Sequence, residues 1–302
     1  MKNFIFTMFL SLLSFNVFAN EKISGVWGFA IGSTQGTYFR QILEQANKEQ
    51  NKYEFVFEHK PGAGGAIASQ YVIGQHPKNI ILAHSAAFFV RPNLYPDTQY
   101  NFNQFKPLMV MGFAPAVLVS KNKSLDEILK QKKLSIATAG AGSSTHLMAE
   151  TFAKTLKGKD VVMVHFKDTN EAFLSVMGGH TDLTFEFLGD AVAKAITDTK
   201  FLGLTGKTTY NKISLLKDVG FKDMEHLSGI FAIYVNKDMS NSTFNELQTV
   251  LLKAEKSESV QNLYKRDFTS KDAYMQTPGD FTNWYNSTVR QYKELTKDIK
   301  LN

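Results

Sequence analysis

The chain has 302 residues, a formal net charge of +6 and no cysteine. This length allows one large or two modest domains, and a hydrophobic content of 43% excludes a disordered chain. Disulfides and thiolate chemistry are excluded, and the basic residues are dispersed without interleaved aromatic residues, so nucleic acid is not an expected partner.

The N-terminus departs from the rest of the chain. Lys2 is followed by an apolar run over residues 4–18 and by the small residue Ala19. This pattern is typical of a secretory signal peptide, which predicts removal of residues 1–19 and export of the mature chain. A membrane anchor is the alternative, although the run is short for a membrane span.

Strand-like and helix-like segments then alternate. The predicted strands cover residues 26–30, 53–57, 80–83, 134–139, 161–166, 182–187 and 201–205, and the predicted helices cover residues 38–46, 66–74, 148–156 and 169–178, with another after Gly189. The apolar stretch 108–119 is long enough for two strands or one bent strand. Alternation of this kind predicts parallel sheets built from strand–helix–strand units.

Helix-start patterns complete this reading. Ser124-x-x-Glu127 predicts a short helix with a capping box. After a strand at 230–235, Thr243-x-x-Glu246 predicts the start of a long helix, and Pro278 predicts the start of the last one.

Three turns rich in glycine and serine each follow a predicted strand and precede a predicted helix. They are the first turn (residues 31–36), the second turn (61–65, Pro-Gly-Ala-Gly-Gly) and the third turn (140–146). Glycine lets a ligand approach the main chain, and the first turn of a helix has N–H groups that favour an anion. Ligands of open α/β sheets bind at such strand ends. With only four arginines, the sequence favours backbone amides as the groups that hold a small anion. The alternative is that these turns bind nothing.

Catalytic signatures are weak. Gly-x-Ser-x-Gly is absent, and the seven histidines show no zinc-ligand spacing, so neither an enzyme, a metal nor a cofactor is expected. The remaining enzymatic alternative is an exported α/β hydrolase that uses Ser143 or Ser144 with His146, for which no orienting third group is recognisable.

Several segments resemble one known family. Residues 57–65, Phe-Glu-His-Lys-Pro-Gly-Ala-Gly-Gly, resemble the Val-Glu-Asn-Lys-Pro-Gly-Ala-Gly-Gly segment of the substrate-binding proteins of tripartite tricarboxylate transporters, also called Bug receptors. Residues 140–147 resemble that family's Gly-x-Gly-Ser-x-x-His-Leu segment, and residues 178–183 resemble its Gly-Gly-x-x-Asp-Leu segment. The order and spacing of these pieces cover nearly the whole mature chain.

The resemblance implies a type II periplasmic binding protein fold, in which two α/β lobes are joined by hinge strands and hold a ligand in the cleft. Lobe one is expected at residues 20–120 plus 231–302, and lobe two at 121–230. The implied function is that of a monomeric periplasmic receptor that captures a small carboxylate and delivers it to membrane permease subunits. A receptor that signals to a membrane sensor kinase is the alternative output.

The resemblance also implies a set of ligand-binding residues. They are Phe29, Gly32, Ser33, Thr34 and Gln35, then Gly62, Gly64 and Gly65, then Ser85, and in lobe two Gly142, Ser143, Ser144, Thr145, Phe166 and Asp182. Three positions depart from the family pattern: Ile31 and Gly36 stand where the family has proline and aspartate, and His59 stands where it has asparagine.

Overall fold

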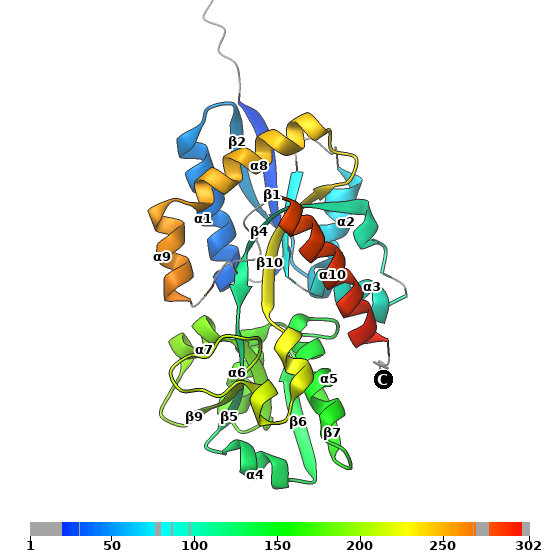
Figure 1. Ribbon diagram of the computed structural model, residues 1–302, viewed down its shortest axis with the longest axis vertical. Coiled ribbons are helices and arrows are strands. Elements are labelled where there is room, and N and C mark those ends of the chain that lie inside the picture. The colour runs from blue at the N-terminus through cyan, green and yellow to red at the C-terminus, as the bar shows by residue number, and fades with distance from the viewer. Residues whose placement is uncertain are drawn as a thin grey trace, which may run out of the picture.

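The computed structural model describes residues 20–29, 31–75, 80–85, 87–96, 98–267, 269 and 278–297. The predicted signal peptide lies outside these residues. The described chain forms two α/β lobes stacked along the long axis of the molecule, each built on one five-stranded sheet (Figure 1). No helix among the described residues is both long enough and apolar enough to cross a membrane.

Lobe one contains segments from both ends of the chain. Its sheet has the order β2-β1-β3-β10-β4. Its elements are β1 (Glu21–Trp27), α1 (Thr34–Glu49), β2 (Tyr53–His59), α2 (Ala66–Gly74), β3 (Ile80–Ser85), α3 (Ala87–Leu94), β4 (Phe105–Ala114), β10 (Gly229–Asn236), α8 (Asn241–Glu255), α9 (Glu258–Arg266) and α10 (Pro278–Thr296). All eight residues of β10 are buried, as expected for a central strand covered on both faces.

Lobe two is one uninterrupted stretch of chain. Its sheet has the order β7-β6-β8-β5-β9. Its elements are β5 (Ala116–Lys121), α4 (Leu125–Lys130), β6 (Lys133–Thr138), α5 (Ser144–Thr155), β7 (Asp160–His165), α6 (Thr169–Met177), β8 (Leu183–Phe187), α7 (Leu188–Lys194) and β9 (Thr199–Leu204).

The two sheets are mixed, which corrects the expectation of parallel sheets. β1, β2 and β3 are parallel, but β10 runs antiparallel to both β3 and β4. In lobe two, β6 is parallel to β7 and β8, whereas β5 runs antiparallel to β8 and β9. The antiparallel strands are the ones that enter a lobe from its neighbour, so no strand–helix–strand unit sets their direction.

Two crossings join the lobes. The apolar stretch 108–119 divides at Pro115 into β4, which pairs in the first sheet, and β5, which pairs in the second. By strand pairing the first crossing therefore lies at Pro115, whereas the expected division fell after residue 120. The chain returns at Gly229, where a Cβ atom would lie 2.4 Å from the Phe187 ring, so this crossing has room only for glycine.

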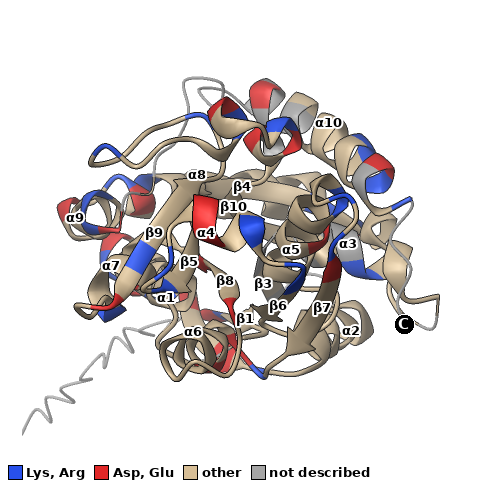
Figure 2. Ribbon diagram, turned by 90° about the horizontal axis from the view of Figure 1, so that it is seen from below, with Lys and Arg blue, Asp and Glu red and all other residues tan. Residues whose placement is uncertain are grey.

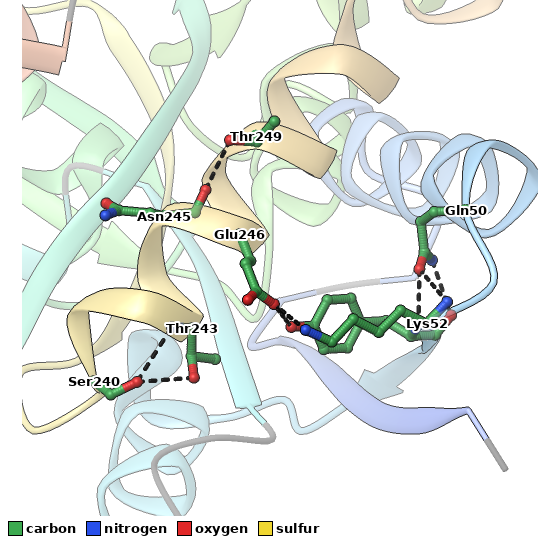
Figure 3. A network of polar contacts seen from close by, with 8 residues as sticks. Gln50, Lys52, Ser240, Thr243, Asn245, Glu246 and Thr249 are labelled. Atoms are coloured by element: carbon green, nitrogen blue, oxygen red, sulfur yellow. Dashed lines mark hydrogen bonds and ion pairs between the residues drawn. The ribbon is translucent and has the colours of Figure 1, made fainter. Parts of the chain in front are cut away.

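The starts of α4 and α8 were both predicted from a capping-box pattern, and only the first of them has that cap. The Ser124 hydroxyl accepts from the Glu127 N–H at 3.3 Å, and the Glu127 carboxylate accepts from the Ser124 N–H at 2.7 Å, which confirms the predicted capping box. The long helix α8, however, is capped by Ser240 rather than starting at Thr243. Its Glu246 carboxylate instead accepts from the Lys52 ammonium and the Tyr53 hydroxyl at the start of β2 (Figure 3). This contact fastens a C-terminal helix of lobe one to an N-terminal strand.

Charged side chains are spread over the surface. Seen along the long axis from the lobe-two end, positions of Lys and Arg are interspersed with positions of Asp and Glu over the helices and loops (Figure 2). This distribution fits the dispersed basic residues of the sequence.

Candidate functional site

The three glycine-rich turns lie together where the two lobes meet. All three follow parallel strands, namely β1, β2 and β6. A Cβ on Gly28, just before the first turn, would lie 3.0 Å from the Gly65 Cα, so the first and second turns are in close contact. A Cβ on Gly64 would lie 3.8 Å from the carbonyl oxygen of Ala141, which brings the second turn of lobe one against the third turn of lobe two. We call this junction the seam.

The first turn leads into α1 and carries a buried amide group. The Ser33 hydroxyl caps the helix by accepting from the Gly36 N–H at 3.4 Å. Gln35 is only 5% exposed, and no described residue accepts a hydrogen bond from its Nε2. A buried donor of this kind is costly unless an acceptor reaches it. At Gly36 a Cβ would lie 2.8 Å from the Trp27 Nε1, which explains why glycine replaces the family's aspartate here.

The second turn has an unusual backbone. Gly62, Ala63, Gly64 and Gly65 all have positive φ angles, of 123°, 48°, 61° and 87°. A turn of this kind can point main-chain N–H groups into a concavity that suits an anion, but the Gly65 N–H is already bonded to the Gly62 carbonyl oxygen at 3.0 Å. The Lys60 N–H donates to the Trp27 carbonyl at 2.8 Å, and the His59 ring is hydrogen bonded to the Phe29 carbonyl at 2.6 Å. These two bonds hold the second turn against the first.

The third turn combines a capped helix with a pair of hydroxyls. The Ser143 hydroxyl accepts from the His146 N–H at 3.1 Å, and the Thr145 hydroxyl accepts from the Ala139 N–H at 2.9 Å. The two hydroxyl oxygens are 3.1 Å apart. Because only one of them can donate to the other, the pair retains one O–H that can donate to a guest.

The histidine in this turn is structural. The Gly142 N–H donates to the His146 Nδ1 at 3.0 Å, and the His146 Nε2 lies 3.4 Å from the Glu150 carboxylate. Neither ring nitrogen of His146 is therefore bonded to the Ser143 hydroxyl. That hydroxyl contacts His146 through its main-chain N–H and not through its ring. This geometry does not form a serine–histidine pair, and it also uses the Gly142 amide, which is then not available to a ligand.

Arg91 reaches the seam from α3 and was missed in the sequence analysis. Its Nη1 lies 3.6 Å from the position that a Gly64 Cβ would take and 3.7 Å from the position that a Gly142 Cβ would take. Its guanidinium carbon lies 4.5 Å from the centre of the Tyr95 ring. The only signal in the sequence was that arginine is rare, and we interpreted that rarity as favouring backbone amides.

The remaining predicted residues lie at different distances from the seam. Phe166 adjoins the third turn, because its carbonyl oxygen would lie 3.4 Å from a Cβ on Gly140. Ser85 is the last residue of β3. Asp182 does not belong to the site: its carboxylate accepts from the Ser135 N–H at 3.0 Å and from the Lys123 ammonium at 3.2 Å. Ser135 precedes the end of β6 by three residues, or about 10 Å of strand, so Asp182 shapes the far end of the sheet.

A second contact between the lobes lies beside the first turn. The Thr34 hydroxyl donates to the carboxylate of Asp190 on α7. Burial raises the pKa of Asp190 above its ordinary value, and the bond from Thr34 opposes this rise. Asp267, which follows α9, packs against Gly189 and accepts from the Tyr38 hydroxyl at 3.0 Å. A polar cluster therefore joins α1, α7 and the end of α9.

We expect Thr34→Val to lower the free energy of unfolding of the ligand-free protein by about 1–3 kcal/mol, because a buried carboxylate oxygen loses its donor. The loss should be larger at about pH 8 than at about pH 5, since removal of the donor disfavours the charged form of Asp190. Urea denaturation at the two pH values measures this. Thr37→Val is the matched control, because among the described residues the Thr37 hydroxyl bonds only to the Ser33 carbonyl in the same helix start. Equal losses in the two variants would contradict a bond between the lobes.

No group of three or more His, Asp or Glu residues in the described part of the chain is arranged to hold a metal ion. The polar groups that gather at the seam, contributed by both lobes, are main-chain N–H groups, hydroxyls, the Gln35 amide and the Arg91 guanidinium.

Known proteins resemble this chain in sequence and in fold. Residues 38–301 match the model of the tripartite tricarboxylate transporter family receptor. The chain belongs to this receptor family. A UPF0065 protein from the tcbD-tcbE intergenic region of Pseudomonas sp. strain P51 is 25% identical to this receptor over 183 residues, which are 57% of this chain and 54% of that protein. The receptor thus spans about half the length of the curated relatives it matches.

Solved structures show the same fold as this receptor. The periplasmic binding protein BugD aligns with a TM-score of 0.81 at 21% identity, over 91% of this chain and 96% of that chain. MatC from Rhodopseudomonas palustris, solved with bound malate, aligns with a TM-score of 0.80 at 16% identity, over 91% of this chain and 98% of that chain. The two-lobed fold of a periplasmic binding protein is therefore shown, and the family is one of receptors, not enzymes.

Proposed function

We propose that this chain is a periplasmic solute receptor that captures a small organic carboxylate between its two lobes, as a monomer, and delivers it to the membrane permease subunits of a tripartite tricarboxylate transporter. The observation that carries the proposal is the meeting of three glycine-rich helix starts from both lobes at one seam. Membership of the receptor family and the malate bound to MatC support it. Export would use the predicted signal peptide at residues 1–19.

In this proposal, each lobe contributes different hydrogen-bond donors to the ligand. In lobe one, the second turn offers the main-chain N–H groups that precede Gly65, whose own N–H is bonded to the Gly62 carbonyl oxygen, and Gln35 offers a buried amide donor. In lobe two, the Ser143 and Thr145 hydroxyls offer one O–H, and Phe166 flanks the turn. A carboxylate that rests on lobe one would draw lobe two onto it, a closure of the kind common in two-lobed binding proteins. The proposed site keeps the residues named from the resemblance except Asp182, and except the Gly142 N–H, which is bonded to the His146 Nδ1.

We expect a carboxylate to raise the thermal unfolding midpoint of the purified receptor. A ligand present at about 100 times its dissociation constant adds about 2.7 kcal/mol to the free energy of unfolding, or roughly 5 °C for a protein of this size. A screen with malate, succinate, citrate, glutamate and benzoate, each paired with its neutral amide, measures this. Shifts limited to the acids support the proposal, and a flat response to all five acids contradicts it.

A further inference from the structure

We propose that Arg91 is the charged group of the carboxylate site, so that recognition of the ligand's negative charge depends on this guanidinium and not on main-chain amides alone. The inference rests on the proposed carboxylate-binding function and deepens it by assigning the residue that selects an anion. Nothing in the family resemblance pointed to this position.

The first argument is the place of the side chain. Arg91 belongs to lobe one, yet its Nη1 lies beside a turn from each lobe, close to Gly64 and to Gly142. These two glycines lack the side chains that would otherwise separate the guanidinium from the main chain of either turn. A guest held by the N–H groups of the second turn therefore lies within reach of the Arg91 fork.

The second argument is that the guanidinium has no carboxylate partner among the described residues. The Arg91 Nε is buried, and no described residue accepts a hydrogen bond from it. None of the described Asp and Glu residues forms an ion pair with Arg91, whereas Arg266 is paired with Asp267 at 2.6 Å. The side chain as a whole is half-buried, and a partly desolvated cation is stabilised when an anion compensates it. A bound carboxylate would supply that compensation and could accept two parallel hydrogen bonds from the guanidinium.

The third argument is that the fork is held in place. The guanidinium lies over the Tyr95 ring at 4.5 Å, and a Cβ on Gly142 would lie 2.9 Å from the same ring. Tyr95 thus fixes the guanidinium on one side and contacts the third turn on the other. An arginine that is positioned before the ligand arrives loses less entropy on binding than a free lysine would.

The test compares Arg91→Gln, Arg91→Lys and Arg91→Met with Arg40→Gln. Arg40 is the matched control because its guanidinium also lies over an aromatic ring, that of Phe57 at 4.7 Å, but on the exposed surface of α1. Binding of malate, succinate, citrate, glutamate and benzoate is measured by calorimetry. For each acid that binds the wild-type protein, we expect Arg91→Gln and Arg91→Met to weaken binding about 10- to 100-fold, Arg91→Lys to weaken it less, and Arg40→Gln to leave it unchanged.

Stability without ligand separates this role from a packing role. Removal of a half-buried cation that has no carboxylate partner should leave the melting temperature of the free protein unchanged or raise it, whereas loss of a structural contact should lower it. Arg91→Met keeps an unbranched apolar side chain in place of the aliphatic part of arginine and serves if the glutamine variant does not fold. If Arg91→Gln and Arg91→Met bind the acids as tightly as the wild-type protein does, the inference about Arg91 is wrong. A lowered melting temperature in both variants also overturns it. Neither result affects the proposed function. A wild-type protein that binds none of the acids overturns the proposed function as well.

Discussion

Gly142→Ala should reduce the affinity for the bound carboxylate by about tenfold or more while the protein still folds. The added methyl group would lie 2.9 Å from the Tyr95 ring across the seam, at a φ of +77° that disfavours any side chain. Overpacking costs about 1–3 kcal/mol, and about 1.4 kcal/mol corresponds to a tenfold change in affinity. The free protein can relieve this contact by separating its lobes, so the cost should appear mainly when the ligand draws them together.

Gly158→Ala provides the matched control. Gly158 has the same φ of +77°, but nothing lies within 4 Å of the position of its Cβ. Both variants should therefore lose about 1 kcal/mol of stability through backbone strain, and only Gly142→Ala should lose affinity in calorimetric titrations. If Gly158→Ala weakens binding equally, backbone strain rather than contact at the seam is responsible.

Glu186→Gln should change how stability depends on pH. Glu186 is fully buried at the end of β8 and accepts from the Lys194 ammonium at 2.8 Å. Burial raises the pKa of its carboxyl group to about 7, with a further rise from Asp190, while Lys194 opposes both. Because this pKa is above the unfolded value, the folded state binds the proton more tightly. The tighter proton binding by Glu186 adds its full amount to the free energy of unfolding below about pH 4.5, and this amount is lost as the pH rises through about 7.

The size of this loss follows from the shift, which corresponds to about 3 kcal/mol between those two pH limits. Glutamine cannot titrate, so the melting temperature of Glu186→Gln minus that of the wild-type protein should increase steadily over this range. Asp160→Asn, which removes a carboxylate from the exposed ion pair with Lys133, is the control and should show no such trend. A difference that stays constant with pH would mean that Glu186 is ionised throughout.

Local patterns in the sequence were sufficient for most individual elements. The capping box at Ser124 and Glu127 formed as predicted, because a cap depends on residues only three apart. The three glycine-rich turns were also recognisable, since positive φ angles at Gly62, Gly64 and Gly65 require residues without a Cβ. Their meeting at one seam followed from the general rule for strand ends in α/β sheets.

Structural features that depend on contacts between residues far apart in the sequence could not be predicted from local patterns. The antiparallel direction of β10 is set by β3 and β4, which are more than a hundred residues away. The bond from Thr34 to Asp190 joins lobes that are separate in sequence. Arg91 shows no periodicity or motif that marks it, and only its position between two turns distinguishes it from a surface arginine. Asp182 matched a family segment, but its partners Ser135 and Lys123 were not evident from spacing.

In the sequence, lobe two is inserted between the two segments that form lobe one, and this insertion affects the order in which the chain can fold. All strands of the second sheet lie between Pro115 and Gly229, whereas the first sheet needs β10 to join β3 with β4. During synthesis from the N-terminus, the middle of the chain can finish its sheet while the opening segments still expose an unpaired strand edge. Such an edge is prone to aggregate. A chain that must cross a membrane before folding would therefore need its first hundred residues protected until the last strand arrives.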